Sequence, residues 1–292
     1  MSELEPGIHQ MSNADYHGET DHLSSSVLKG FLPEHYKQGG SQDALDFGTL
    51  FHTVVLEPDD LDEYVVLDAH AIAGSNPKTG KPYDSPQMTA KFKAAALAAA
   101  EDGRIVVTQD QWDQAHRMAE AVKAHALANE LIHEGAGTYE ESVFAVTDAG
   151  VRHKARFDRR IPGRIIDLKS TNAKPSDYAL TRAAMDYGYD LSAAHYLAVA
   201  ELAGLDAEDF TLVFVTKDEP HHVMVCDLSE AFLDRGRVLR DLAVERATNP
   251  DAPRYFGASE ALTLHPPGYA NLAPAVETAI PADFTWSLNE YA

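Results

Sequence analysis

Two carboxylates and a lysine lie close together near the middle of the sequence, within VRHKARFDRRIPGRIIDLKST, residues 151–171. Asp158 is followed by Asp167 and then by Lys169. Carboxylate oxygens are the ligands that Mg²⁺ and Mn²⁺ prefer, and an adjacent lysine can orient water or offset developing negative charge. These residue types are the minimum set for binding a divalent cation beside a phosphodiester. The spacing alone is a loose signal, because D-x-K triplets arise by chance in many chains.

The same segment predicts two strands that would bring these side chains together. Pro162-Gly163 predicts the turn between them. The apolar run before Asp167 is typical of a buried strand, in which Asp167 and Lys169 share one face. In the first strand every second residue is charged, so four side chains share one face: Arg152, Lys154, Arg156 and Asp158.

Composition limits the class of protein. The 292 residues supply enough apolar content for a substantial core. The single cysteine, Cys226, excludes a disulfide framework and a multi-cysteine metal or iron–sulfur site, and we expect it to be structural. The sequence has neither an apolar run of about 18 residues nor a signal-peptide pattern. We therefore expect a cytosolic protein without a membrane span.

The charge is unevenly distributed. The net charge of −22 argues at face value against a nucleic-acid binder. Residues 152–174, however, contain eight lysines and arginines and two aspartates, a net charge of +6, which leaves −28 on the rest of the chain. A basic feature in an acidic body would confine a polyanion to one groove. A solvated basic hairpin is the alternative interpretation.

The rest of the sequence predicts helices and short strands around this pair. Apolar periodicity predicts helices at 43–56, 91–100, 109–133, 190–204 and 229–248, another ending near 185, and a short serine-capped one before 31. Strands are predicted at 139–146, 210–216 and 223–226, residues 105–107 are ambiguous, and 69–86 reads as a flexible flap. We expect a single domain over residues 1–250 and a C-terminal tail at 251–292.

Five motifs extend the pattern beyond the hairpin. They are LSSSVLKGFL, FGTLFHTVVLEPDDLDEYVV, YEESVF with KARFD, IIDLKST, and YDLSAAHYLA, all within residues 16–204. In this order they resemble the RecE-type branch (exonuclease VIII-like phage and prophage exonucleases) of the PD-(D/E)xK nuclease superfamily. The resemblance implies an α/β, restriction-endonuclease-like fold: a mixed central sheet flanked by helices, with an N-terminal helical elaboration.

The resemblance also implies roles for individual residues. Asp158 and Asp167 match the metal-binding carboxylates, and the main-chain carbonyl of Leu168 would be a further ligand. Lys169 matches the superfamily lysine that orients or helps to deprotonate water. A lone histidine in an apolar helix is ordinarily a core residue, but His52 matches the histidine that lies beside the metals in this branch. We therefore expect His52 in the active site.

The metal-binding glutamate has two candidates. Glu140 and Glu141 are adjacent, and a strand directs neighbouring side chains to opposite faces. The resemblance favours Glu140, because the E-x-S pattern of the family fits Glu140 with Ser142. Because the length of the hairpin is unknown, Glu141 stays an alternative metal ligand.

Further residues are candidates for DNA contact. Tyr196 matches the tyrosine of the last motif, whereas Ser192 stands where the branch usually has glutamine. His195 is expected to be structural. Basic residues that could grip phosphates are Arg156, Arg159, Arg160 and Lys174, and Arg152 and Lys154 could line the approach.

Taken together, the motifs predict a Mg²⁺-dependent exodeoxyribonuclease, with Mn²⁺ as a substitute metal. By resemblance it would degrade linear double-stranded DNA 5′ to 3′ from an end, leave 3′ single-stranded overhangs for recombination, and form a homo-oligomeric ring. A RecT-type annealing protein would be its partner in the cytoplasm of a bacterial host. Two alternatives stay open: a catalytically inactive module that binds DNA ends or supports assembly, and a nuclease of the same superfamily that acts on single-stranded or branched DNA.

Overall fold

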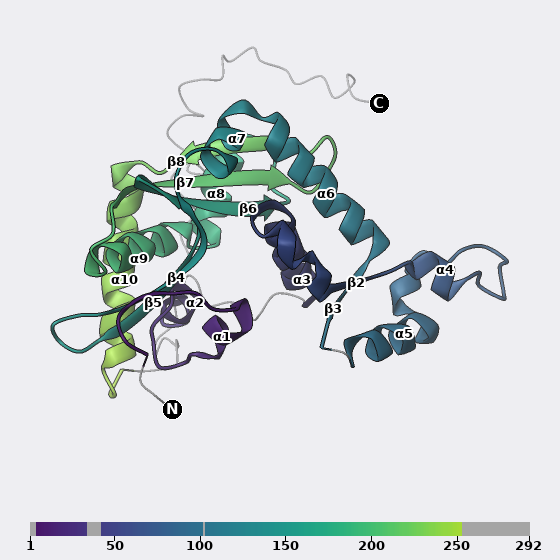
Figure 1. Cartoon of the computed structure of the whole chain (residues 1–292), viewed down its shortest axis with the longest axis horizontal. Helices are drawn as coiled ribbons and strands as arrows, with labels where there is room; N and C mark the ends of the chain where they lie inside the picture. Colours follow the sequence, from purple (N-terminus) through teal and green to yellow (C-terminus); the bar gives the residue numbers. More distant parts are fainter. Residues whose placement is uncertain (1–3, 34–41, 102, 253–292) are drawn as a thin grey trace, which may run out of the picture. The chain divides into compact units, whose positions relative to one another are not determined.

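A six-stranded mixed sheet forms the centre of the computed structural model, which describes residues 4–33, 42–101 and 103–252 (Figure 1). The strand order is β1-β4-β5-β6-β7-β8; β6 and β7 are parallel and every other neighbouring pair is antiparallel. The strands are β1 (Gly7–His9), β4 (Thr138–Val146), β5 (Arg152–Ile161), β6 (Gly163–Thr171), β7 (Ala207–Thr216) and β8 (Val223–Asp227). The expected α/β fold, with a mixed central sheet flanked by helices, is confirmed.

Helices cover both faces of this sheet because the inner strands are apolar on both sides. Along β7, Val213 and Val215 belong to a core with α3 (Gln42–Leu56), α6 (Gln109–Ala124) and α7 (Ala126–His133). The alternate residues Leu212 and Phe214 pack in a second core with α8 (Asp177–Asp186) and α9 (Tyr189–Leu202). This two-sided burial explains the uninterrupted apolar run in β7.

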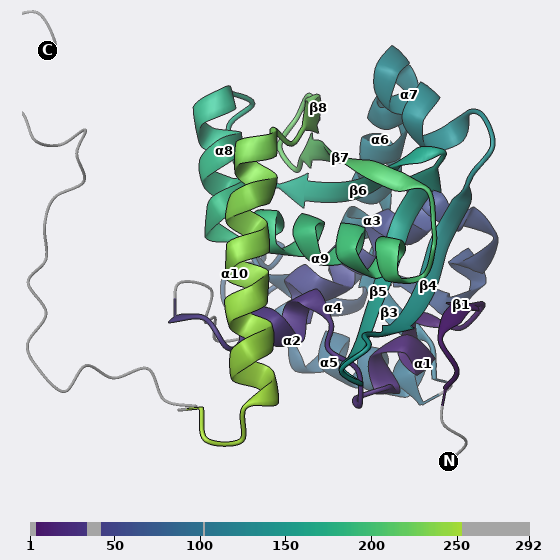
Figure 2. The same cartoon turned by 90° about the vertical axis from the view of Figure 1, so that its left-hand side faces the viewer.

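Helix α10 (Glu230–Thr248) packs on α9, and Figure 2 shows the two helices crossing on the same side of the sheet. Gly236 permits this close approach, since a Cβ atom there would lie 2.1 Å from the carbonyl oxygen of Asp190. Arg235 forms an ion pair with the buried Asp190 carboxylate at the same contact. The two helices are therefore joined by both close packing and charge.

The N-terminal segment contributes two short helices, α1 (Asn13–Gly18) and α2 (Ser25–Lys29). The side chain of Ser24 caps α2, in line with the predicted serine cap. Between these helices Leu23 pairs with His153 of β5 in a parallel bridge. The backbone of Leu23 donates to the carbonyl of Arg152 and accepts from the N–H of Lys154. The segment around Leu23 thus pairs with the first residues of β5, which do not pair with β6.

Two predicted elements differ from the structure. Residues 69–86, predicted to be a flexible loop, begin with the short helix α4 (Ala69–Ala73); residues 74–85 contain turns, bends and an isolated bridge, and lead to a 3₁₀ turn, η3 (Pro86–Met88), before α5 (Ala90–Ala100). The helix predicted at 109–133 is divided at His125, whose extended backbone ends α6 and whose side chain accepts from Ala128 N–H to cap α7. Histidine is not among the usual N-cap residues, so sequence rules did not signal this break.

The ambiguous residues 105–107 belong to a second, two-stranded sheet. Strand β3 (Ile105–Thr108) pairs in parallel with β2 (Tyr64–Leu67), which follows the 3₁₀ turn η2 (Pro58–Glu63). In the part of the chain that the structure describes, no helix has the length and apolarity needed to cross a membrane. The C-terminal tail expected at 251–292 lies outside the described residues from 253 onward.

Candidate active site

The site lies where β5 and β6 separate. The two strands pair over three residue pairs beside the turn, from Arg159–Ile166 to Ile161–Arg164. One residue further from the turn, the Asp158 carboxylate accepts a hydrogen bond from the backbone N–H of Leu168 at 2.7 Å. A side chain therefore replaces the backbone pairing at this point. The carboxylate of Asp158 is held in place without losing its remaining acceptor positions.

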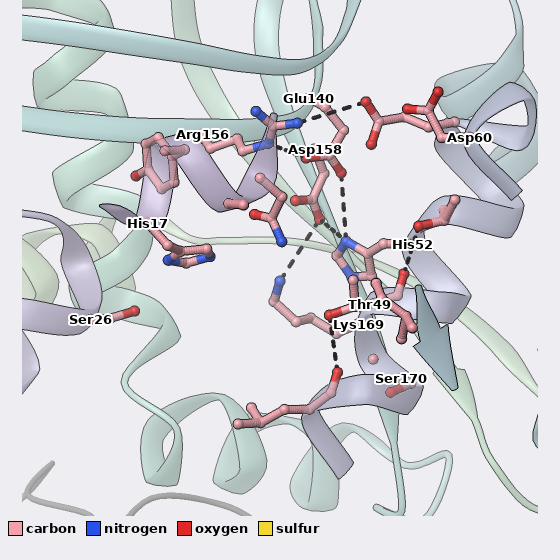
Figure 3. Close-up of a pocket in the computed structure, with 18 of the residues that line it drawn as sticks. His17, Ser26, Thr49, His52, Asp60, Glu140, Arg156, Asp158, Lys169 and Ser170 are labelled. Carbon is pink, nitrogen blue, oxygen red and sulfur yellow. Dashed lines mark hydrogen bonds and ion pairs between the residues drawn. The ribbon is translucent and has the colours of Figure 1, made fainter. Parts of the chain in front are cut away.

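A cavity of about 1420 Å³ opens beside this point, and Figure 3 shows its labelled side chains. His52 of α3, Glu140 of β4, Asp158 of β5 and Lys169 of β6 point toward one another in it. Four different elements thus deliver one functional group each. The N-terminal segment, including His17 and Ser26, forms the facing wall.

His52, Glu140 and Asp158 form a cluster that fits a metal ion. One ligand atom from each lies within 4.8 Å of the other two. The Nδ1 atom of His52 is 3.6 Å from Asp158 Oδ2 and 3.9 Å from Glu140 Oε1. Two carboxylates and an imidazole are a donor set suited to a divalent metal ion. Burial opposes protonation of His52, but the Asp158 and Glu140 carboxylates outweigh it and raise its pKa.

Asp167 and Lys169 form a buried pair beside this cluster. Lys169 Nζ lies 2.8 Å from Asp167 Oδ2 and 3.8 Å from Asp158 Oδ2, and it donates to the Leu168 carbonyl at 3.2 Å. Burial raises the pKa of Asp167, although Lys169 acts in the opposite direction. Burial would lower the pKa of Lys169, but the two carboxylates outweigh it and raise that pKa. Lys169 is therefore a cation at neutral pH.

Glu140 is held in an uncommon backbone conformation. Its φ of 46° lies in the left-handed region, which non-glycine residues adopt rarely and at a cost of about 1–3 kcal/mol. Its side chain is fixed by Arg156, whose Nε donates to Glu140 Oε2 at 2.7 Å. Burial would raise the pKa of Glu140, yet His52 and Arg156 together lower it. Glu140 is thus kept ionised and aimed at His52.

Arg156 connects this glutamate to the surrounding structure. Its Nη1 donates to Ser142 Oγ at 2.8 Å and to the carbonyl of Met11 at 3.0 Å. Its Nη2 lies 3.7 Å from Glu57. The predicted E-x-S pattern therefore corresponds to a single arginine that contacts both Glu140 and Ser142.

Glu141, the alternative metal ligand, lies outside the cluster. Its buried carboxylate accepts two hydrogen bonds from Arg160, of 2.7 and 2.9 Å. A carboxylate in a bidentate pair with arginine is already satisfied. The structure brings Glu140, and not Glu141, to His52 and Asp158.

Most of the basic residues predicted to contact phosphates either bind other groups of the protein or lie outside the cavity lining in the described chain. Arg159 is buried, donates to the carbonyls of Glu134 and Gly135, and lies over the ring of Tyr139. Lys154 is buried and donates to the carbonyls of Tyr16 and Glu19. Among the described residues, the cavity lining includes Arg156 and Tyr196 and leaves out Arg152, Lys154, Arg159, Arg160, Lys174 and Ser192. The alternation along a strand predicts which face of the sheet a side chain is on, but it does not predict the group with which that side chain forms a hydrogen bond or ion pair.

The residues expected to be structural are placed as follows. His195 is buried, and its Nε2 donates to the Lys154 carbonyl at 3.0 Å. Cys226 is a partly buried free thiol on β8. Both lie outside the cavity lining in the described chain.

Some cavity residues were not expected from the sequence. Glu57, directly after α3, lines the cavity, and burial together with Glu140 raises its pKa to about 7. Lys217 and Arg104 add positive charge to the lining, and Tyr187 and Tyr189 add aromatic surface. Glu57 belongs to the Leu-Glu-Pro part of the second motif, and this motif could have identified it as a site residue. The others lie at element ends, where periodicity carries no information.

Comparison with solved structures agrees with this fold. Among solved structures, a protein from Eubacterium rectale described provisionally as an exonuclease has a TM-score of 0.53 and 14% identity, and covers 87% of this chain and 97% of its own. A phage-related exonuclease from Haemophilus somnus 129PT matches at 12% identity, with coverage of 62% and 92% and a TM-score of 0.28. The first likeness supports the fold, and the second is too weak to support an argument. No curated protein matches the sequence significantly.

A family profile matches most of the chain. The profile describes a PDDEXK-like domain of unknown function, DUF3799, and it matches residues 28–247. This range contains His52, Glu140, Asp158, Asp167 and Lys169. The match establishes the PD-(D/E)xK superfamily, while the RecE-type branch stays a prediction. The chain therefore belongs to the DUF3799 family of PDDEXK-like domains.

Proposed function

We propose that this protein is a metal-dependent deoxyribonuclease that hydrolyses phosphodiester bonds from the ends of linear double-stranded DNA. The observation that supports it best is the convergence of His52, Glu140 and Asp158 within 4.8 Å, beside the Asp167–Lys169 pair. The Glu140 and Asp158 carboxylates face the same His52 nitrogen, and a cation bound between them would relieve their mutual repulsion. The large adjoining cavity supplies room for a nucleic-acid strand.

The metal would be held by His52, Glu140 and Asp158, and by Asp167 and the Leu168 carbonyl if Lys169 releases them. A bound Mg²⁺ or Mn²⁺ would supply a Lewis acid that lowers the pKa of the attacking water and offsets charge on the phosphate. Arg156 keeps the Glu140 carboxylate ionised and oriented. The Asp158–Leu168 hydrogen bond fixes the strands on either side.

Lys169 has a separate task in this proposal. Its raised pKa keeps a proton on Nζ at neutral pH. A protonated lysine beside the cluster stabilises negative charge that develops on the phosphate oxygens and can donate a hydrogen bond to the water. Removing this side chain should lower the rate of hydrolysis more than the affinity for DNA.

The test is digestion of an end-labelled linear duplex with Mg²⁺. We expect release of the 5′ label as mononucleotide, no attack on covalently closed circles, and loss of activity in Asp167→Asn and Lys169→Ala. Lys123→Ala, which removes an exposed lysine on α6, is the matched control and should digest normally. Wild-type activity in either site variant would refute the assignment. Binding of DNA ends without hydrolysis or metal binding would favour the inactive module.

The direction of DNA degradation, the form of its product and the partner proteins are proposed from the RecE-type resemblance. The 5′-to-3′ polarity, the 3′ overhang, a RecT-type annealing partner and a homo-oligomeric ring are parts of this proposal. Light scattering of the purified protein tests the ring, and a monomer would contradict it. Labelling the 3′ end instead of the 5′ end tests the polarity, since early release of the 3′ label would reverse it.

A further inference from the structure

Lys217 is a partly buried cation in the cavity, and no acidic side chain pairs with it in the described chain. It follows β7 directly and lines the cavity that contains the metal-fitting cluster. No carboxylate oxygen of the described residues lies within 4 Å of its Nζ atom. The side chain instead lies over an aromatic ring, with Nζ 4.8 Å from the ring centroid of Phe47 on α3.

The other cations of the described cavity lining are bound to groups of the protein. Arg156 and Lys169 form the ion pairs with carboxylates given above. Arg104 donates three hydrogen bonds, of 2.6 to 3.2 Å, to main-chain carbonyls. These side chains hold parts of the cavity wall together. Lys217 has no such task within the described residues.

The backbone of Lys217 is fixed although its ammonium has no polar partner in the described chain. Its N–H donates to the carbonyl of Thr171 at 2.9 Å, which continues the pairing of β7 with β6. Its carbonyl accepts from the side-chain amide of Gln114 at 2.8 Å. Lys169 pairs with Phe214, three residues earlier in the chain, so the rise of a strand puts Lys217 roughly 10 Å further along the sheet. Lys217 is thus near the metal-fitting cluster but outside it.

An ammonium in this position is stabilised when an anion binds to it. Burial lowers the pKa of Lys217, and no carboxylate of the described residues offsets that effect. The chain has a net charge of −22, so it repels a polyanion except where cations are available. Lysine binds phosphate as a point charge on a flexible stem. The proposed DNA substrate offers such an anion at every nucleotide.

Helix α3 leaves open space beside this lysine. Gly48 and His52 line the cavity one turn apart, and Gly48 directly follows Phe47. Apart from its chain neighbours and its own helical backbone, a Cβ atom on Gly48 would have no described atom within 4 Å. Glycine inside a helix lowers stability relative to alanine, and packing gives no reason for it here. Open space beside a cation fits a ligand backbone that approaches the helix closely.

We propose that Lys217 binds a phosphate of the DNA strand that enters the active site, and that Gly48 leaves the space through which this strand passes. The bound phosphate is a neighbour of the one to be cut, because Lys217 lies outside the metal-fitting cluster. Phosphate contacts position a strand and carry no sequence information. The inference rests on the proposed nuclease function and names a substrate-binding site for it.

Fluorescence anisotropy of a labelled linear duplex, with EDTA present so that no strand is cut, tests Lys217. Lys217→Met keeps an unbranched stem over Phe47 and removes the charge. We expect its affinity to be about 5- to 10-fold weaker at about 0.1 M salt, the counterion contribution of one phosphate. The slope of log affinity against log salt concentration should be shallower by about 0.7–0.9. Lys217→Arg keeps the charge and should restore both values.

A second lysine and a modified ligand separate this contact from general charge. Lys174→Met removes an exposed lysine outside the described cavity lining and should bind like the parent protein. Duplexes with one uncharged methylphosphonate linkage, moved along the strand, should include one that weakens the parent but not Lys217→Met. Equal losses in the two lysine variants would overturn the proposal. Unchanged affinity and salt slope in Lys217→Met, or no such linkage position, would also overturn it.

Gly48→Leu tests the open space. Leucine favours a helix more than glycine does, so urea unfolding should show a variant at least as stable as the parent. Its affinity for the duplex should nevertheless fall, because the added side chain occupies the space left for the strand. Parent-like DNA binding by this stable variant would refute the path over α3.

The outcome is distinguishable from failure of the proposed function. The binding assays require neither metal nor hydrolysis, so they are read independently of activity. A parent protein that binds the duplex through Lys217 but does not digest it with Mg²⁺ would refute the nuclease and leave the phosphate site. A parent that digests DNA while Lys217→Met binds normally would refute the phosphate site alone.

Discussion

The Asp158 carboxylate accepts a hydrogen bond from the backbone N–H of Leu168 at 2.7 Å, across the gap that opens between β5 and β6. The accepting oxygen also lies 3.6 Å from His52 Nδ1 and 3.8 Å from Lys169 Nζ. One oxygen atom thus joins the sheet to the metal-fitting cluster. Its structural and chemical roles can be separated by substitution.

Asp158→Asn should abolish Mg²⁺-dependent hydrolysis but keep the fold, because the amide oxygen can still accept from Leu168 N–H. Asp158→Ala should be inactive and also less stable by about 1–3 kcal/mol, since it leaves a buried N–H without a partner. Urea unfolding of the two variants measures the difference. Equal stability of the two would show that this hydrogen bond contributes nothing to the fold.

Glu140→Gln and Glu141→Gln should have opposite effects. Glu140→Gln removes a charge from the cluster and should weaken Mn²⁺ binding at least about tenfold. Glu141→Gln leaves the cluster intact, but it removes the carboxylate that holds Arg160 and should cost about 1.5–3 kcal/mol of stability. Titration calorimetry and urea unfolding measure both. Weaker metal binding in Glu141→Gln alone would return the role to Glu141.

Arg156→Lys should lower metal affinity although the charge is kept. Lysine lacks the planar fork that contacts Glu140, Ser142 and Met11 at once. Loss of such an orienting partner typically costs 10- to 100-fold in metal affinity. Calorimetry with Mn²⁺ is the measurement, and Arg182→Lys, an exposed arginine on α8, is the matched control. An unchanged affinity would mean that the orientation of Glu140 does not depend on Arg156.

Stability should fall as the pH drops below about 6.5, in part because of His195. Burial lowers its pKa to about 3 in the folded protein, whereas the unfolded value is about 6.5. Between these values the unfolded chain binds a proton that the folded chain does not, so acid favours unfolding. At pH 5 the effect is about 2 kcal/mol. Thermal unfolding from pH 7 to pH 5 should show it, and His195→Gln should have a shallower dependence than His70→Gln.

Periodicity was sufficient to predict the strands and the helix that carry several of the candidate site residues. The period of two in β5 and the apolar run in β6 predicted strands that bring Asp158, Asp167 and Lys169 together. The helical rhythm of 43–56 placed His52 on a helix packed against that sheet. Such local signals depend only on side-chain types and spacing.

The partners of the charged residues could not be predicted in the same way. Periodicity gave no indication that Arg160 pairs with Glu141, or that Arg159 lies on Tyr139. These contacts depend on where distant backbone groups arrive in three dimensions. The positive φ of Glu140 and the short β5–β6 ladder are likewise set by tertiary structure. The net charge of +6 on residues 152–174 therefore overstated the positive charge available to bind a ligand, because several of these cations are bound to other groups of the protein.

The N-terminal segment has a consequence for where this domain begins. The family match starts at residue 28, yet the Lys154 ammonium donates to the carbonyls of Tyr16 and Glu19, and Arg156 donates to Met11. A protein shortened to the matched range would leave two buried cations without these acceptors and would lose the Leu23 bridge to β5. The boundary defined by sequence similarity thus leaves out residues whose contacts hold β5, and a protein trimmed to residues 28–247 should be less stable than the full chain, which urea unfolding would measure.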